Sequence, residues 1–242
     1  ALLGLPELDN KIDILSHRDG SQVPVLHAFS EQLVPRPQDW PQHATTTGYW
    51  QLKTDSSDYQ PPKTLTDFLA HHTRPVYIGF GSMSGGDPVR TSQIVVDAVI
   101  KSGIRAIIAT GWGGLKTGHL PENILVIDAA PHDWLFPQVT AVVHHGGAGT
   151  TAAGLTAGKP TLICPFFGDQ PFWGSQIKRR GLGPKPIKQK QLTVDNLAAA
   201  LTQLVSDPQL KHKAQKVAEQ LSQENGIANA IKWMEQLGLL ER

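Results

Sequence analysis

From residue 75 onward, short apolar runs alternate with stretches in which apolar residues recur at helical spacing. The apolar runs are bounded by glycine, proline or polar residues and are typical of buried strands. They lie at residues 76–80, 105–109, 124–127, 141–143 and 161–164. Such runs, separated by helical segments, predict βαβ units and therefore a parallel sheet.

The intervening stretches predict helices. In residues 88–101, Pro88 suits a first helical turn, and apolar residues recur on one face behind it. Further helices are expected at 133–136, at 152–158 behind a small-residue turn, and at 171–180, 194–205, 208–223 and 228–237. Right-handed crossovers then give an α/β fold with a doubly wound, Rossmann-like parallel sheet, and a ligand site at the carboxyl ends of its strands.

The first 62 residues differ from the rest. They are rich in proline and contain one convincing strand, at 23–29, while residues 55–62 have the composition of a linker. They hold too little apolar material for a domain of their own. We therefore expect them to be the tail of a domain that lies outside this chain.

Charge and cysteine content narrow the function classes. The chain has 22 Lys and Arg against 21 Asp and Glu, a net charge of +1, which gives no general attraction to nucleic acid. Its single cysteine, Cys164, lies in an apolar run and reads as a small buried hydrophobe. No internal disulfide is possible, which fits the cytoplasm. No apolar run is long enough to span a bilayer, and the first residues lack the basic flank of a signal peptide.

The most informative stretch is 144–151, His-His-Gly-Gly-Ala-Gly-Thr-Thr, between a buried strand and a helix start. A helix N-terminus presents unpaired N–H groups and a partial positive charge, and glycines let an anion approach the backbone. His145, Thr150 and Thr151 add side-chain donors. This is phosphate-binding chemistry. A metal pair of His144 and His145 is the rival interpretation, disfavoured because adjacent strand residues point to opposite faces.

Other loops would meet at the same sheet edge. Ser82 follows the first strand in a glycine-serine loop, which is also compatible with an ordinary βα turn. Trp112, between glycines, is either a pocket wall on which a base or sugar stacks or a lid over the core. Ala130 and His132 follow the third strand, where free backbone groups can pair with a flat heterocycle, and Trp134 reads as core packing.

Asp169 and Gln170 follow the fifth strand. A carboxylate beside an amide suits a polyhydroxyl ligand, since the pair both accepts and donates hydrogen bonds. The alternative is that Asp169 simply caps the helix behind it.

These motifs together carry a resemblance. The run 144–174 is similar to the donor-site signature of UDP-glycosyltransferases with the two-domain GT-B fold. The turns at 79–83 (Gly-Phe-Gly-Ser-Met), 111–114 (Gly-Trp-Gly-Gly) and 131–136 (Pro-His-Asp-Trp-Leu-Phe) resemble those of the sterol 3-β-glucosyltransferase branch, and residues 24–50 look like the segment that ends the family's N-terminal domain. The resemblance implies a C-terminal domain of a GT-B glycosyltransferase, divided into an N-terminal tail and linker (1–62), a UDP-sugar-binding domain (63–227) and a crossing helix (228–242).

The resemblance also implies residue roles. The diphosphate would be held by Ser82, His145, Gly147, Thr150 and, unless it caps the helix instead, Thr151. Ala130 and His132 would frame the uracil, Trp112 would line the nucleotide pocket, and Asp169 and Gln170 would bind the sugar hydroxyls. Two departures, Ala153 where plant members place a ribose-binding Glu and Ala129 where they place a stacking Trp, point away from the plant natural-product branch.

The implied reaction is an inverting, metal-independent transfer of glucose from UDP-glucose, the donor substrate, to a sterol or other lipophilic hydroxyl, with no cofactor. The catalytic base and the acceptor pocket would lie in the missing N-terminal domain, so that no catalytic residue falls in this chain and the chain alone would be inactive. We further expect no nucleic-acid partner, peripheral membrane contact, and a homodimer through the exposed apolar face of the final helix.

Two other interpretations stay open. The chain could be a non-catalytic nucleotide-sugar-binding subunit that needs a separate acceptor-domain partner. It could also belong to a sugar-nucleotide epimerase of related fold, whose catalytic residues would again lie elsewhere. The acceptor, UDP against TDP, and glucose against other hexoses rest on the resemblance alone.

Overall fold

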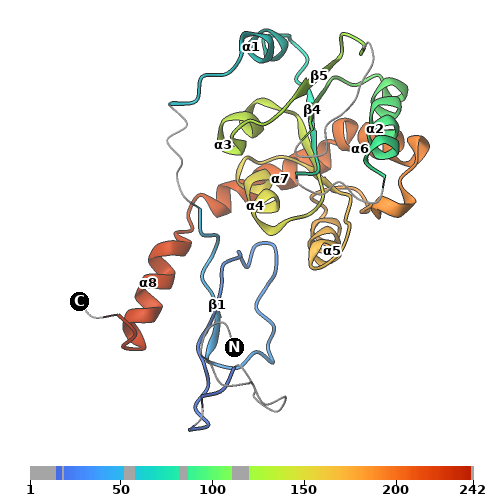
Figure 1. The fold of residues 1–242 in the computed structure, drawn as a ribbon. Helices are drawn as coiled ribbons and strands as arrows, with labels where there is room; N and C mark the ends of the chain where they lie inside the picture. The colour runs from blue at the N-terminus through green and yellow to red at the C-terminus, as the bar shows by residue number, and fades with distance from the viewer. Residues whose placement is uncertain (1–14, 18, 52–57, 82–86, 111–119, 241–242) are drawn as a thin grey trace, which may run out of the picture. The chain divides into compact units, whose positions relative to one another are not determined.

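The computed structural model describes residues 15–17, 19–51, 58–81, 87–110 and 120–240 (Figure 1). The chain divides into two compact units. One combines Ala1–Gln51 with Glu224–Arg242, and the other is Leu52–Gln223. Of the predicted site residues, Ser82 and Trp112 lie outside the described residues.

The larger unit is built on five parallel strands. These are β3 (Val76–Gly79), β4 (Ala106–Ala109), β5 (Ile124–Ile127), β6 (Ala141–His144) and β7 (Thr161–Ile163), in the spatial order β5-β4-β3-β6-β7. The first strand of the unit is therefore central, and the chain adds strands first on one side and then on the other. The predicted doubly wound parallel sheet is confirmed.

Helices cover both faces of this sheet (Figure 1). They are α1 (Lys63–Leu69), α2 (Pro88–Ser102), α3 (His132–Leu135), α4 (Ala148–Thr156), α5 (Gln170–Arg180), α6 (Val194–Ser206) and α7 (Pro208–Leu221), with short 3-10 turns η3 (Phe136–Gln138) and η4 (Gln189–Gln191). Helices α2 and α6 lie side by side on one face.

Alternation along the strands supplies two cores. Val76, Ile78 and Val143 pack with α2 and α6, whereas Tyr77 and Val142 pack on the opposite face with α1, α3 and η3. Both sets are almost completely buried, so the sheet is covered on both sides as expected for a parallel sheet. Cys164 is fully buried, and burial raises the pKa of its thiol to about 12, which confirms its interpretation as a small core residue.

Side-chain caps fix several helix starts. Asp87 accepts from the N–H of Arg90 at 2.9 Å at the start of α2, and Asp207 accepts from the N–H of Gln209 at 2.9 Å at the start of α7. Thr193 and Asn196 form a reciprocal capping box at the start of α6.

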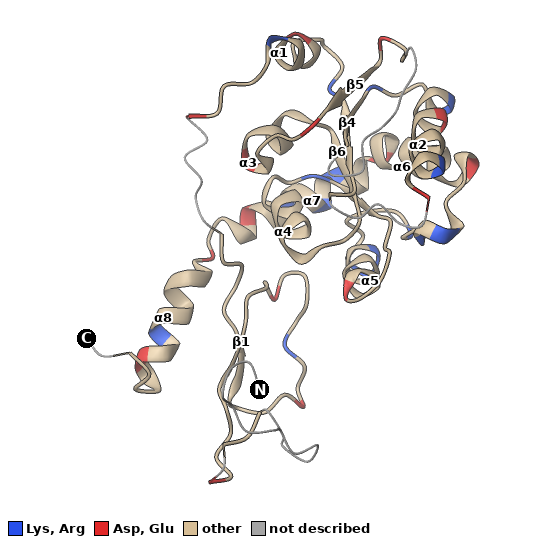
Figure 2. Cartoon of the chain, viewed as in Figure 1, with Lys and Arg blue, Asp and Glu red and all other residues tan. Residues whose placement is uncertain are grey.

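Figure 2 shows acidic and basic residues interspersed over the helices of this unit, in keeping with the balanced net charge.

The smaller unit brings the two ends of the chain together. It holds a parallel pair, β1 (Val25–His27) with β2 (Ala44–Thr46), and the helix α8 (Gly226–Gln236). The Ser30 hydroxyl donates to Glu224 at 2.6 Å, and the Asn229 amide donates to the Thr47 carbonyl at 2.9 Å. A methyl group on Gly226 would lie 2.4 Å from the Tyr49 carbonyl oxygen, so glycine is required for this close approach.

Some elements differ from the sequence prediction. The first 62 residues were expected to contain a single strand, but they contain two, β1 and β2. Helix α1 was not predicted. Helix α4 begins at Ala148, earlier than the predicted 152–158, and α8 begins at Gly226 rather than 228. Among the described residues, no helix is long and apolar enough to cross a membrane.

Candidate functional site

The candidate site lies where the carboxyl ends of β3 and β6 meet. These two strands are direct neighbours, with Gly79 opposite His144, and the chain leaves them in opposite directions across the sheet. A crevice at such a switch point is the usual ligand site of a doubly wound sheet. The loops after β3, β5, β6 and β7 all reach this edge.

His145 lies between the loop after β3 and the start of α4. A methyl group on Gly81 would be 3.5 Å from its Cε1, and one on Gly147 would be 2.7 Å from its Nε2. Glycine at 147 therefore makes room for the imidazole beside the helix N-terminus. The ring is half-buried, and its Nδ1 is buried with no hydrogen-bond partner among the described residues. Burial lowers the pKa of His145, and the nearby Asp169 carboxylate raises it in part.

The N-terminus of α4 carries no side-chain cap. Its N-cap residue is Gly147, no acidic residue lies in the first turn, and Ala148 and Gly149 are exposed. Helices α2, α6, α7 and α8 each have a capping side chain, whereas α1, α3 and α5, like α4, have none. The uncapped N–H groups and helix dipole of α4, with the half-buried His145 ring beside Gly147, form an arrangement suited to an anion.

The two threonines of the motif have different surroundings. Thr151 is fully buried and its hydroxyl donates to the Gly147 carbonyl at 2.9 Å, within the first turn of α4. Thr150 is partly exposed. The arrangement therefore favours Thr150 over Thr151 as a side-chain donor to a ligand. The Thr151 hydroxyl bonds within the helix, but it donates to a carbonyl and does not cap the helix N-terminus.

His144 and His145 do not form a chelating pair. Their ring centroids are 6.0 Å apart and the rings are nearly perpendicular, at 86°. His144 is fully buried. Within the described ranges, no group of three or more His, Cys, Asp or Glu side chains is arranged to hold a metal ion.

The loop after β5 brings His132 to the same edge. Its ring stacks on Phe136 with centroids 4.3 Å apart and meets the Tyr77 ring edge-on at 5.9 Å. Burial lowers the pKa of His132, and the Asp133 carboxylate opposes that shift. Ala130 packs against the same cluster as Trp134, which confirms core packing for that tryptophan. The His132 ring is thus fixed by aromatic contacts.

Asp169 and Gln170 stand at the junction of β7 and α5. Asp169 occupies the N-cap position but makes no capping hydrogen bond, because its carboxylate instead accepts from the Trp173 indole N–H at 2.7 Å. Gln170 is buried, and its Oε1 accepts from the N–H groups of Phe166 at 2.8 Å and Phe167 at 3.3 Å. Asp169 is therefore the exposed member of the pair, and Gln170 shapes the loop that carries it.

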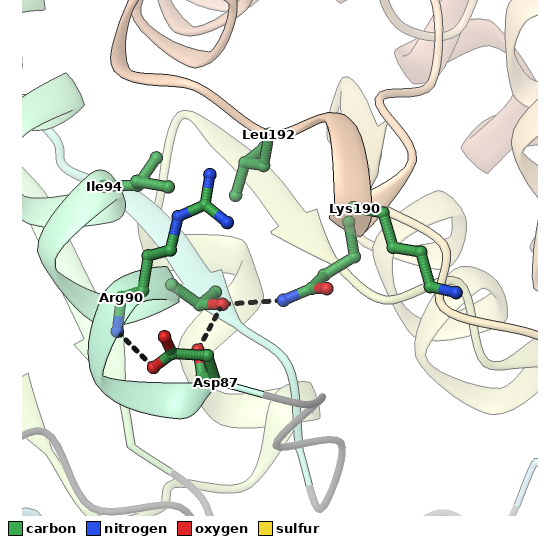
Figure 3. A pocket seen from close by; sticks show the side chains of 7 residues that line it. Asp87, Arg90, Ile94, Lys190 and Leu192 are labelled. Atoms are coloured by element: carbon green, nitrogen blue, oxygen red, sulfur yellow. Dashed lines mark hydrogen bonds between the residues drawn. The ribbon is translucent and has the colours of Figure 1, made fainter.

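A separate cavity of about 260 Å³ lies between the start of α2 and η4. Its lining residues are Asp87, Arg90, Thr91, Ile94, Gln189, Lys190 and Leu192. Figure 3 shows the Arg90 guanidinium between Ile94 and Leu192, with the Asp87 carboxylate bonded to the Arg90 backbone. None of the predicted site residues that the structure describes lines this cavity.

The comparison with protein families shows to which family this chain belongs. The model of the family described as "Erythromycin biosynthesis protein CIII-like, C-terminal domain" matches residues 93–237. The chain belongs to this family. The match begins within α2 and covers every described element from β4 to α8, including the candidate site after β6 and β7.

Curated relatives agree with the resemblance seen in the motifs. The chain is 43% identical over 214 residues to a sterol 3-beta-glucosyltransferase of Arabidopsis thaliana, UGT80A2, covering 88% of this chain and 33% of that protein. It is 39% identical over 245 residues to the sterol 3-beta-glucosyltransferase of Neurospora crassa, covering 95% of this chain and 15% of that protein. The predicted similarity to this branch is confirmed, and the chain spans a third or less of these relatives.

Solved structures agree on the fold. The glycotransferase of kitacinnamycin superimposes with a TM-score of 0.73 at 21% identity, covering 89% of this chain and 55% of that one. The calicheamicin glycosyltransferase CalG4 gives a TM-score of 0.70 at 16% identity, covering 93% and 54%. The fold is that of the C-terminal half of a GT-B glycosyltransferase, as predicted.

Sequence reasoning missed two contributors to the site. Trp173 holds the Asp169 carboxylate, and the four-residue spacing on a helix start was the available signal. His144 was weighed as a metal ligand, whereas the structure shows its Nδ1 accepting from the Gly146 N–H at 3.0 Å.

Proposed function

We propose that this chain is the donor-binding half of an inverting glycosyltransferase that moves glucose from UDP-glucose to a sterol or another lipophilic hydroxyl. The observation that carries the proposal is the uncapped N-terminus of α4 with His145 beside it. An anion there would receive backbone N–H groups, a helix dipole and an imidazole donor from one direction. The names of the curated relatives supply the sugar and the acceptor class.

In this proposal the chain's own residues bind and stabilise the donor. Negative charge grows on the departing diphosphate during transfer, and the N-terminus of α4 and His145 already face it. Asp169 accepts from sugar hydroxyls, while Gln170 keeps its loop in place. Gly147 leaves room for the His145 ring beside the helix N-terminus, and Thr150 adds a hydroxyl donor. The catalytic base and acceptor pocket come from a part of the enzyme outside this chain.

Calorimetric titration of the chain with UDP, UDP-glucose and TDP-glucose tests the donor assignment. We expect binding of UDP and UDP-glucose and weaker binding of TDP-glucose. A glucosyl-transfer assay with a sterol and this chain alone should show no turnover, whereas the longer protein should turn over. Absence of any nucleotide binding, or efficient transfer by the isolated chain, would contradict the proposal.

A conservative change at Asp169 should weaken the binding of the sugar without affecting the binding of the nucleotide. In Asp169→Asn an oxygen can still accept from the Trp173 indole, but the charged acceptor for sugar hydroxyls is lost. We expect UDP-glucose affinity to fall about tenfold, the loss expected for a charged hydrogen bond, and UDP affinity to stay unchanged. Titrations should be run at alkaline pH, because there the Asp169 charge no longer affects the protonation of His145.

An equal loss for UDP and UDP-glucose in Asp169→Asn would show that Asp169 acts on the phosphates or on the fold instead. Glu219→Gln is a suitable control, since it removes an exposed carboxylate from α7 in the same unit.

Replacing Gly149 should move stability and binding in opposite directions. A methyl group there has no heavy atom within 4 Å, and the residue lies in the first turn of α4. Gly149→Ala should therefore stabilise the ligand-free chain by about 0.5–1 kcal/mol in urea unfolding. It should also weaken UDP binding about tenfold, because the added methyl group occupies space that we assign to the diphosphate. Unchanged UDP affinity would place the phosphates elsewhere.

A further inference from the structure

His144, the last residue of β6, has no assigned role in donor binding. It shares a sheet face with Val142 and is completely buried. Its Nδ1 accepts the backbone N–H of Gly146, two residues along the chain, at 3.0 Å. The imidazole thus closes a short turn at the point where β6 ends and the anion-facing segment begins.

The hydrogen bond fixes the state of the ring. Because Nδ1 is the acceptor, the proton of the neutral imidazole lies on Nε2. That Nε2 is buried and has no hydrogen-bond partner among the described residues. Burial lowers the pKa of His144 to about 3, so the ring stays neutral and keeps Nδ1 as an acceptor. The ring therefore leaves one of its own polar atoms unpaired while it pairs the Gly146 N–H.

The turn that His144 closes determines where His145 and the N-terminus of α4 lie, the two groups that we propose bind the diphosphate. Gly146 has φ +98°, and a methyl group there would lie 2.6 Å from Cγ2 of Ile163. The backbone is in the left-handed region and packed against β7, so it has little freedom. His145 and Gly147 flank Gly146, and their directions are set by this turn.

We propose that His144 is a positioning residue for donor binding: its Nδ1 holds the Gly146 turn so that His145 and the N-terminus of α4 face the diphosphate. This role rests on the proposed function. The role depends on one hydrogen-bond-accepting atom. It therefore predicts that this atom, rather than the volume of the imidazole, governs the affinity for UDP-glucose.

Two substitutions separate the acceptor from the packing. His144→Asn keeps an acceptor at the corresponding atom, because an asparagine side chain commonly accepts from the N–H two residues on. It leaves unfilled space and a buried amide, so it should lower stability. His144→Leu fills the space with apolar atoms and has no acceptor. It removes the unpaired Nε2 but leaves the Gly146 N–H unpaired, so stability should change little.

The experiment measures UDP-glucose affinity by calorimetry and ligand-free stability by urea unfolding for the unmodified chain and both variants. We expect His144→Leu to lose at least about tenfold in affinity at nearly unchanged stability, and His144→Asn to retain affinity despite lower stability. A purely structural residue would give affinity losses that follow the stability losses. Equal affinity in the Leu variant, or loss in the Asn variant with the fold intact, would overturn the proposal.

Amide hydrogen exchange of Gly146 provides a readout that needs no ligand. The Gly146 amide should exchange slowly in the unmodified chain and in His144→Asn, and faster in His144→Leu. Fast exchange in the unmodified chain would overturn the proposed turn. If the unmodified chain fails to bind UDP-glucose, the proposed function fails and takes the positioning role with it. If it binds and the Leu variant binds equally well, the positioning role alone fails.

Discussion

Removing the His145 side chain is expected to weaken UDP-glucose binding about 10- to 150-fold, the loss that follows from deleting one hydrogen bond to a charged group. The Nε2 side of the ring lies against Gly147 at the uncapped start of α4. Its Nδ1 has no hydrogen-bond partner among the described residues. His145→Ala removes the donor while leaving the helix N-terminus in place. Calorimetry with UDP-glucose measures the loss.

The same variant should abolish a pH dependence. Burial lowers the pKa of the His145 imidazole in the free chain, and a bound diphosphate would raise that pKa because it favours the charged ring. Binding then takes up a proton, so UDP-glucose affinity should rise as pH falls through the pKa of the bound state and level off below the pKa of the free state. UDP-glucose is the better probe than UDP, since each of its phosphates has one ester bond and one shared anhydride bond, so that neither titrates in this range.

His212→Ala serves as the control for loss of a histidine, because His212 is exposed on α7 and far along the chain from the motif. It should leave both the affinity and its pH dependence unchanged. His145→Ala with unchanged affinity and a native circular dichroism spectrum would exclude His145 as a phosphate ligand.

Placing an alanine at position 183 is expected to cost at least about 4 kcal/mol of unfolding free energy, among the largest effects of single substitutions. A methyl group there would lie 1.7 Å from the Thr161 carbonyl oxygen and 2.8 Å from its carbon. Both are backbone atoms of β7, whose N–H at Thr161 is bonded to the Leu182 carbonyl at 2.9 Å. The segment after α5 could then no longer pack along β7.

Urea unfolding of the ligand-free Gly183→Ala chain measures this cost, and Gly149→Ala is the matched control because its added methyl group meets nothing within 4 Å. A loss smaller than about 1 kcal/mol, the ordinary effect of a point substitution, would mean that the chain around 183 does not run against β7 as described.

The strands were predictable because a parallel sheet covered on both faces produces continuous apolar runs. All five lie within a residue or so of their predicted bounds. Strand β2, Ala44-Thr45-Thr46, has no such run, and its pairing with β1 depends on contacts distant in sequence. The early start of α4 was missed because Ala148 and Gly149 give no amphipathic signal.

For the candidate site, the motif predicted the loops that meet, because the carboxyl ends of parallel strands share one edge. It could not predict side-chain direction. Whether Asp169 caps α5 or bonds to Trp173, and whether His144 faces solvent or accepts from Gly146, is decided by local backbone geometry and packing. Thr151 illustrates the same limit, since the sequence alone leaves its hydroxyl free to serve either a ligand or the helix.

The pairing of the chain's two ends has a consequence for the order of events during synthesis. Ser30, Thr47 and Tyr49 contact Glu224, Asn229 and Gly226, which emerge from the ribosome after the whole of 52–223. The larger unit has its own sheet and cores, so it can fold while the earlier segment is still waiting. The contacts between the two ends of this chain therefore form after the sequence of the larger unit has been made, however early the residues of the first segment appear.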